Sequence, residues 1–355
     1  MSVYVIAEAG VNHNGSRDMA LQLVDEAAKA GVDAVKFQTF SANKLVARHA
    51  PKAEYQLKTT DEAESQFEMI RKLELSLDDH VALIAHAKTR GVAFLSTPFD
   101  DDSLHLLTGR FGISTIKVSS GDLTNAPFLL EIARTAERVI ISTGMATLGE
   151  IESALGVLAF GFTAPASAKP SRLAFEAAWA SPEGHAAVRA RAVVLHCTTE
   201  YPAPVAEVNL RAMDALAQAF AVPVGYSDHT QGIHIPVAAV ARGATLIEKH
   251  FTLDRNLPGP DHKASLEPGE LTAMMAAIRD VEQALGDGVK RPTPSEIKNR
   301  VVARKSLVAA HDLAAGAPLA IACKRPGSGR SPFDYWDLTG KPAGRPYKAD
   351  EVLDE

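Results

Sequence analysis

Two histidines, His229 and His250, give the first chemical signal in the sequence, because each stands at or just past the end of a short apolar run. Their separation is that of one strand-plus-helix unit, which would place both imidazoles at the same end of a parallel sheet. Two neutral imidazoles with carboxylates nearby suit a divalent metal ion. A pair of hydrogen-bonded structural histidines is the alternative, so the interpretation depends on the residues around them.

Lysines stand near the ends of two of the other short β-rich runs, Lys36 in Ala34–Phe37 and Lys117 in Thr115–Val118. Lys36 and Lys117 would be costly there without an anionic partner. Together with Ser120, Gly121 and Ser142 they would form a cradle for a phosphate or a carboxylate, with the lysines supplying charge and the hydroxyls and backbone N–H groups supplying directed hydrogen bonds.

Carboxylates complete the set of polar strand ends. Glu8, Glu248 and Asp261 are candidates for acid–base or metal-side groups, although Glu248 could serve only as an ion-pair partner of a lysine. Short polar residues at strand ends are often only caps or turns, and that is the better interpretation of the following three taken singly: Ser119, Thr143 and Asp228.

The elements that would position these residues alternate between short β-rich runs and helical stretches. Such alternation predicts parallel strands buried on both faces and, with eight units, a (β/α)8 TIM barrel. An open doubly wound sheet is the second choice, but Asn12-His13-Asn14-Gly15 stands where its Gly-rich fingerprint would follow the first strand. The predicted strands are Val3–Ala7, Ala34–Phe37, Ala93–Leu95, Thr115–Val118, Val139–Ile141, Val193–Leu195, Val222–Gly225 and Thr245–Ile247.

Three segments follow from the distribution of helical pattern, proline and glycine. We expect a barrel domain over 1–288, a linker over 289–300 and a small domain over 301–355 that needs a docking partner. The Ala-, Ser- and Pro-rich stretch 163–191 reads as an irregular surface elaboration away from the chemistry, with Phe175 and Trp179 as packing anchors.

Composition excludes several classes of function. A net charge of −6 without a basic block argues against nucleic-acid and anionic-membrane partners. No apolar run reaches the roughly 20 residues of a membrane helix. Cys197 and Cys323 read as free thiols in a reducing cytosol, so we expect a cytoplasmic protein.

Taken together, the strand-end motifs resemble the bacterial N-acetylneuraminate (sialic acid) synthase family, including the legionaminic acid synthases. The similarity covers nearly the whole chain except 163–191. The matching motifs are Ile6-Ala7-Glu8-Ala9-Gly10-Val11-Asn12-His13, Val35-Lys36-Phe37-Gln38-Thr39, Lys117-Val118-Ser119-Ser120-Gly121-Asp122, Ser142-Thr143-Gly144-Met145, His196-Cys197-Thr198-Thr199-Glu200-Tyr201-Pro202, Ser227-Asp228-His229-Thr230, Glu248-Lys249-His250-Phe251-Thr252, Gly259-Pro260-Asp261-His262 and Lys324-Arg325-Pro326-Gly327.

This resemblance implies a TIM barrel followed by a small C-terminal antifreeze-like (SAF) domain. It implies condensation of phosphoenolpyruvate with an open-chain N-acetylmannosamine-type sugar, giving a nonulosonic acid and phosphate. It also implies a divalent metal on His229 and His250, Mn²⁺ first, with Mg²⁺ or Co²⁺ as alternatives. The catalytic residues implied are Glu8, Lys36, Lys117 and Asp261, and the substrate-binding residues are Gln38, Thr97, Ser120, Ser142, Thr199, Tyr201, Ser227 and Arg325.

Two further points concern the partner subunit and the sugar. The resemblance implies a domain-swapped homodimer in which Arg325 of the small domain reaches the partner's site. Thr199 stands where several members carry Asn. The motifs leave open whether the sugar is N-acetylmannosamine or 2,4-diacetamido-2,4,6-trideoxymannose. Two other functions stay as alternatives, an aldol-type barrel that uses no phosphoenolpyruvate and a non-catalytic carbohydrate-binding barrel.

Overall fold

The computed structural model describes residues 2–48, 50–53, 56–57, 60 and 64–353, which form two compact units, Met1–Leu285 and Gly286–Glu355. The first unit contains an eight-stranded parallel sheet with the strand order β3-β2-β1-β8-β7-β6-β5-β4. The strands are β1 (Tyr4–Gly10), β2 (Ala34–Thr39), β3 (Ala93–Pro98), β4 (Thr115–Val118), β5 (Arg138–Ser142), β6 (Ala192–His196), β7 (Val224–Asp228) and β8 (Leu246–His250).

This order is that of a TIM-like barrel with one seam. β3 and β4 lie side by side, but no regular hydrogen-bonded ladder joins them within the described residues. The expected architecture of parallel strands and outer helices is therefore confirmed, and the second choice, an open doubly wound sheet, is not.

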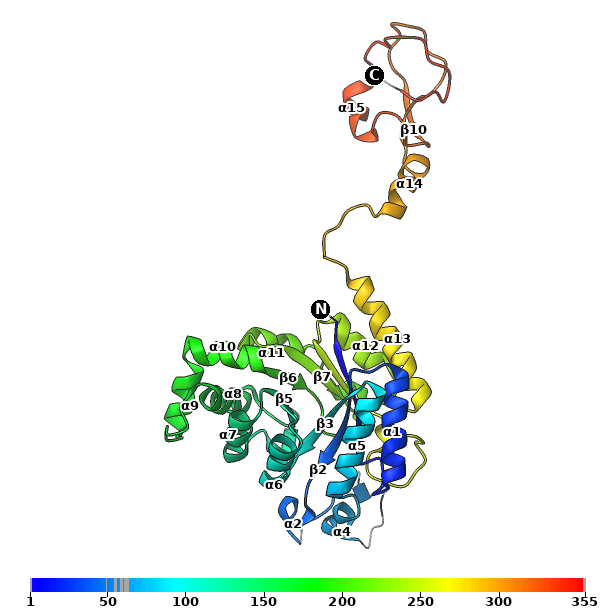
Figure 1. The fold of residues 1–355 in the computed structure, drawn as a ribbon. Helices are drawn as coiled ribbons and strands as arrows, with labels where there is room; N and C mark the ends of the chain where they lie inside the picture. The colour runs from blue at the N-terminus through cyan, green and yellow to red at the C-terminus, as the bar shows by residue number, and fades with distance from the viewer. Residues whose placement is uncertain (1, 49, 54–55, 58–59, 61–63, 354–355) are drawn as a thin grey trace. The chain divides into compact units, whose positions relative to one another are not determined.

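Helices surround the strands, as Figure 1 shows, and α1 packs against both α5 and α13. The helices of this unit are α1 (Arg17–Ala30), α2 (Ala42–Leu45), α4 (Gln66–Arg71), α5 (Leu77–Arg90), α6 (Asp101–His105), α7 (Ala126–Thr135), α8 (Leu148–Thr163), α9 (Arg172–Trp179), α10 (Pro182–Arg191), α11 (Ala212–Phe220), α12 (His234–Ala241) and α13 (Pro268–Leu285).

The local sequence explains where the helices begin and end. At the start of α5, the Ser76 side chain accepts a hydrogen bond from the backbone N–H of Asp79, whose carboxylate accepts one from the backbone N–H of Ser76. At its end, Gly91 adopts a left-handed conformation with φ of 72° and donates to the last carbonyls. The helix is therefore bounded by a capping box at its start and by a left-handed glycine at its end.

The stretch 163–191 is more regular than expected. It contains α9 and α10, which pack on α8, and the predicted anchors are both used. Phe175 lies edge-on to Phe160 at 5.3 Å between ring centroids, and Trp179 is buried against Phe220. The prediction of an irregular elaboration was wrong. The Ser and Pro residues, which suggested an irregular segment, cap the N-termini of two short Ala-rich helices.

The second unit holds a small core of its own. The strands β9 (Ser306–Ala309) and β10 (Ile321–Lys324) pair antiparallel, and α15 (Tyr335–Leu338) follows. A helix, α14 (Pro294–Ala303), occupies the second half of the predicted linker, where Thr293 and Glu296 form a capping box. Part of the predicted linker 289–300 is therefore helical, because a proline at an N-terminal helical position, here Pro294, is compatible with a helix. The core is formed by Leu307, Ala309, Leu313, Leu319, Ile321, Ala343, Tyr347 and Leu353.

Candidate active site

The inward-facing side chains of the barrel form tiers, because every second residue of a strand faces the same way. The first tier is an apolar floor made of Ile6, Ala34, Leu95, Ile140, Leu195 and Leu246. The second tier is polar. Its residues stand two positions further along the strands of the first tier, or at the same level on β4 and β7. They are Glu8, Lys36, Thr97, Lys117, Ser142, Ser227 and Glu248. A third tier contains Gln38, His229 and His250.

Lys36 is the centre of one half of the second tier. Its Nζ forms an ion pair with Glu8 Oε2, donates to Thr97 Oγ1 at 2.9 Å and lies 3.6 Å from Glu248 Oε2. All four side chains are buried. Burial would lower the pKa of Lys36, but Glu248 and Glu8 together raise it above its ordinary value. Lys36 is therefore a fixed positive charge at the base of the site.

Lys117 is the centre of the other half of the second tier. Its Nζ donates to Ser142 Oγ at 2.7 Å and lies 3.4 Å from Glu248 Oε1, and the same Glu248 oxygen accepts from Ser227 Oγ at 2.9 Å. Burial lowers the pKa of Lys117, although Glu248 opposes this effect. Glu248 thus joins the two lysines, which is the ion-pair role that the sequence left open for it.

The two glutamates of this tier differ in ionisation. Burial raises the pKa of Glu8 to about 7, even though Lys36 is next to it. Burial would also raise the pKa of Glu248, but Lys117 and Lys36 bring it down to about 2. Near neutral pH the tier therefore holds two lysines against one firmly ionised carboxylate, so an anion entering the cavity would supply the missing negative charge.

Small residues next to the second tier bring hydroxyl groups into the same space. The Ser120 hydroxyl accepts from the backbone N–H of Gly144 at 3.0 Å. A Cβ atom at Gly144 would lie 2.1 Å from Thr199 Oγ1, so only glycine fits between them. Among the described residues, Thr199 Oγ1 has no hydrogen-bond partner although it is buried. This region can therefore donate to an oxygen-rich ligand.

His229 and His250 lie above the second tier with ring centroids 5.5 Å apart. The carbonyl of Thr198 lies 2.5 Å from His229 Nδ1, so this nitrogen donates and Nε2 keeps its lone pair. Burial lowers the pKa of His229 to about 4 and that of His250 well below its ordinary value. Both imidazoles are neutral, as metal ligands must be.

The surroundings of the two imidazoles also suit a cation. Among the described residues, His250 Nδ1 is buried without a hydrogen-bond partner, 4.0 Å from Asp261 Oδ2. Burial raises the pKa of Asp261 to about 6, and a bound cation would favour its ionised form. Tyr201 stacks on His229 at 4.2 Å between ring centroids. No group of three or more His, Cys, Asp and Glu side chains placed to hold a metal occurs in the described part of the chain, so the pair would need ligands from substrate or water.

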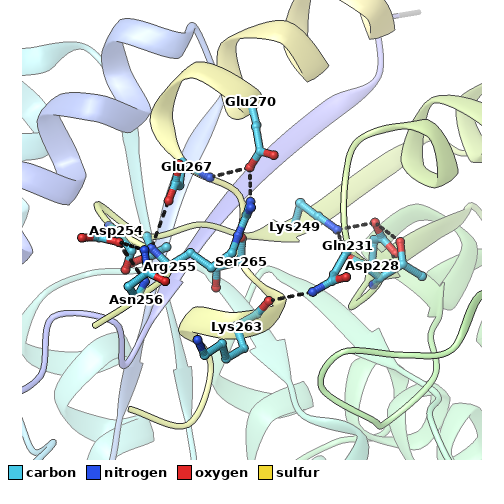
Figure 2. A network of polar contacts seen from close by, with 12 residues as sticks. Asp228, Gln231, Lys249, Asp254, Arg255, Asn256, Lys263, Ser265, Glu267 and Glu270 are labelled. Carbon is cyan, nitrogen blue, oxygen red and sulfur yellow. Dashed lines mark hydrogen bonds and ion pairs between the residues drawn. The ribbon is translucent and has the colours of Figure 1, made fainter. Parts of the chain in front are cut away.

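A buried ion pair behind the cavity connects the ends of β7 and β8. Lys249 Nζ lies 2.6 Å from Asp228 Oδ2, both side chains are fully buried, and Asp228 also accepts from Thr230 N and Tyr226 Oη. Figure 2 shows this pair beside the contacts of Arg255 with Glu267 and Glu270 in the segment after β8. Asp228 is therefore structural, as expected, and the pair holds the strands that carry the two histidines.

Replacing Lys249 by methionine should destabilise the protein by about 3–5 kcal/mol, because Asp228 would remain buried without its counter-charge. Thermal unfolding of the full chain measures the effect. The double variant Asp228→Asn, Lys249→Met should recover part of the loss, and the exposed Lys263→Met should behave like the wild type. A Lys249→Met protein within 1 kcal/mol of the wild type would show that the pair contributes little.

Sequence reasoning missed the contacts that hold the segment carrying Asp261. Asn12 Nδ2 donates to the carbonyl of Phe251 at 2.8 Å and to Ser265 Oγ at 2.9 Å, and Asn14 Nδ2 donates to the carbonyl of Pro258 at 2.9 Å. From the sequence, the Asn-rich motif after β1 was noted only as a departure from the Gly-rich fingerprint and, in part, for the family resemblance. Its own signal was the pair of amides, which can bridge the backbone of a neighbouring loop.

A cavity of about 410 Å³ opens at this end of the barrel. It is lined by every site residue that the sequence predicts in the barrel, together with an unpredicted wall from the segment after β2. Arg325 belongs to the second unit, where it is exposed directly after β10. The predicted residues of the cavity are Glu8, Lys36, Gln38, Thr97, Lys117, Ser120, Ser142, Thr199, Tyr201, Ser227, His229, His250 and Asp261.

A parallel barrel with a charged, hydroxyl-lined cavity at the C-terminal ends of its strands is the architecture of a TIM-type barrel enzyme that takes an anionic substrate. The sequence matches the NeuB family model over residues 23–290. The chain belongs to the NeuB family.

The sequence similarity to named relatives covers nearly the whole chain. An N,N'-diacetyllegionaminic acid synthase from Campylobacter jejuni is 49% identical over 354 residues, which are 99% of this chain and 98% of the relative. The synthase of the same name from Legionella pneumophila is 41% identical, covering 96% of this chain and 90% of its own. Among solved structures, the N-acetylneuraminic acid synthetase of Leptospira borgpetersenii is 31% identical with a TM-score of 0.66, covering 84% of this chain and 90% of that one.

Within the described residues, no helix combines the length and the apolarity that crossing a membrane requires.

Proposed function

We propose that the cavity condenses phosphoenolpyruvate with an open-chain N-acetylmannosamine-type sugar, giving a nonulosonic acid and inorganic phosphate. One observation carries this proposal: two buried lysines share one ionised glutamate directly beneath two neutral imidazoles. An anion site therefore adjoins a site suited to a cation, as a reaction between an anionic enol ester and a sugar aldehyde needs. The names of these three relatives, two N,N'-diacetyllegionaminic acid synthases and an N-acetylneuraminic acid synthetase, agree with it.

The second tier would hold phosphoenolpyruvate. Lys36 and Lys117 would neutralise its phosphate and carboxylate, and hydroxyl groups would direct them through charge-assisted hydrogen bonds. Because these groups are already held by one another in a buried site, they need little reorganisation when charge moves during the reaction. The hydroxyls in question belong to Thr97, Ser120, Ser142, Thr199 and Ser227.

His229 and His250 would hold a divalent cation, most suitably Mn²⁺, with Mg²⁺ or Co²⁺ as alternatives. The unpartnered Nδ1 of His250 and the fixed tautomer of His229 support this assignment. When bound, the cation would supply Lewis-acid polarisation of the sugar aldehyde.

The reaction would join C3 of phosphoenolpyruvate to the aldehyde carbon of the sugar. Water then adds to C2, and the C–O bond to the phosphate breaks, so phosphate leaves while C2 becomes the keto carbon. Glu8 would take or give the proton, because a pKa near 7 suits general acid–base work at neutral pH. Gln38, Tyr201 and Asp261 would bind the sugar from the third tier.

The acceptor sugar has two candidates. N-acetylmannosamine would give N-acetylneuraminate, and 2,4-diacetamido-2,4,6-trideoxymannose would give diacetyllegionaminate. The 49% identity to the Campylobacter synthase favours the second sugar.

The second unit would act as an SAF domain in a domain-swapped homodimer. Its small core makes it marginal alone, so docking on another subunit would stabilise it. The exposed Arg325 would then reach the sugar in the partner's cavity. We also propose that the enzyme works in the cytoplasm, where both free cysteines stay reduced.

A phosphate-release assay with Mn²⁺ tests the proposed function. Phosphate should form only when phosphoenolpyruvate and an N-acetylated mannose-type sugar are both present, in a 1:1 ratio to the keto acid. Condensation without phosphoenolpyruvate would instead favour an aldol-type barrel. Sugar binding without any turnover would favour a carbohydrate-binding protein.

A further inference from the structure

The cavity has a second wall that differs chemically from its charged base. This apolar wall consists of side chains from the segment after β2 and from the end of β3, and none of them was predicted from the sequence. The apolar wall is Phe40, Leu45, Met69, Ile70, Leu73 and Phe99.

The apolar wall begins one step beyond the third tier. Phe40 follows Gln38 by two residues and Phe99 follows Thr97 by two, so both continue the inward-facing rows of their strands. Their rings meet edge-on, with centroids 6.2 Å apart. The helices α2 and α4, which carry the aliphatic members other than Leu73, lie against each other. The wall is thus a packed surface and not a set of loose side chains.

The apolar wall also lies on the sugar side of the cavity. A Cβ atom at Gly10 would lie 3.4 Å from Gln38 Nε2 and 3.5 Å from His250 Cε1. The side chains of Gln38 and His250 therefore both lie close to the backbone of Gly10. The inward-facing residues Gln38 and Phe40 therefore lead from a position beside the imidazoles to the apolar wall. A sugar held by its aldehyde at the imidazoles and extended along this row would place its far end, the sixth carbon, against the apolar wall.

Two glutamines of the lining near the apolar wall, Gln56 and Gln66, contact each other. Gln66 Nε2 lies 3.4 Å from Gln56 Oε1, which also accepts from the backbone N–H of Ala53 at 3.0 Å. Within the described lining, the lysines are Lys36 and Lys117, and both belong to the second tier. Glutamine amides can still serve the amide of an acylamino group, but among the described lining residues of this chain no cation lies on the wall to receive a phosphate.

We infer that the apolar wall determines substrate specificity, selecting an N-acylated hexosamine whose sixth carbon is a methyl group over one whose sixth carbon bears a hydroxyl or a phosphate. This inference rests on the proposed function. A methyl group gains from contact with the wall, whereas a hydroxyl would lose hydration against its apolar side chains. Differences of one such group are worth about 10- to 200-fold in kcat/KM.

The test compares three sugars with phosphoenolpyruvate and Mn²⁺ in the full-length enzyme. They are N-acetylmannosamine, its 6-deoxy analogue and 2,4-diacetamido-2,4,6-trideoxymannose, so the effect of the sixth carbon is separated from that of the second acetamido group. We expect kcat/KM for the 6-deoxy analogue to exceed that for N-acetylmannosamine by about 10-fold or more. Ile70→Asn, which adds a polar group to the wall, should reduce this ratio about 10-fold, and Ile70→Leu should preserve it.

Equal kcat/KM values for the first two sugars in the wild type would overturn the inference while leaving the proposed function intact. An unchanged ratio in a folded Ile70→Asn enzyme would overturn the assignment to this wall. If Ile70→Asn does not fold, the wild-type ratio decides alone. Absence of phosphate release with all three sugars would overturn the proposed function and the inference with it.

Discussion

Replacing Lys36 by methionine should lower kcat/KM about 10³-fold, with phosphate release from phosphoenolpyruvate and sugar as the measurement. Lys36 is the positive charge that Glu8, Glu248 and Thr97 hold in place at the base of the cavity. Methionine keeps the length of the side chain but removes the charge that would face the phosphate or carboxylate of the substrate. Neutralisation of Glu8 by protonation would limit the accompanying loss of stability, because its pKa is already raised.

Two matched variants make this result specific. Lys88→Met removes a lysine from the exposed face of α5 and should leave kcat/KM unchanged. Glu8→Gln combined with Lys36→Met removes both partners of the ion pair and should restore stability but not activity. Activity of Lys36→Met within threefold of the wild type would contradict the assignment of Lys36 to the anion site.

Replacing His229 by alanine should abolish metal-dependent turnover and weaken Mn²⁺ binding by about 100-fold or more, with the fold intact. The same result is expected for His250→Ala. The two imidazoles are neutral and buried in the third tier, where alanine removes a nitrogen lone pair without leaving a buried charge. Calorimetric titration with Mn²⁺ measures binding independently of activity, and circular dichroism checks the fold.

The control is His105→Ala, which removes an exposed histidine that pairs with Glu131 away from the cavity. It should bind Mn²⁺ and turn over like the wild type. A His229→Ala enzyme with near-normal activity after its metal has been stripped would contradict the assignment of the metal to this pair.

The strand-end residues could be placed from the sequence because strand geometry is periodic. Lys36 and Gln38, or Glu248 and His250, are alternate residues of short apolar runs, so each pair had to face the same side. Parallel strands then bring their C-terminal ends together whatever the loop lengths, and these predicted residues line one cavity. The ionisation states of the two glutamates could not be predicted from the sequence. That Glu248 is ionised and Glu8 is near its pKa depends on distances to two lysines that come from other strands.

The apolar wall and the Asn12 contacts escaped prediction for a different reason. Met69 and Ile70 look like ordinary core residues in sequence, and only the tertiary position of α4 turns them towards the cavity. Asn12 acts through the backbone of a loop far away in sequence, which leaves no pattern of residue types to recognise. Helix α14 was missed because proline marks both helix starts and linkers.

Phosphoenolpyruvate labelled with ¹⁸O at the bridging oxygen tests the central claim most directly. Turnover with the acceptor sugar and Mn²⁺ should move the label into inorganic phosphate, because the C–O bond breaks, while the keto oxygen of the product comes from water. Unlabelled phosphate, with the ¹⁸O retained in the carbon product, would mean that the P–O bond breaks and would contradict the condensation that we assign to this cavity.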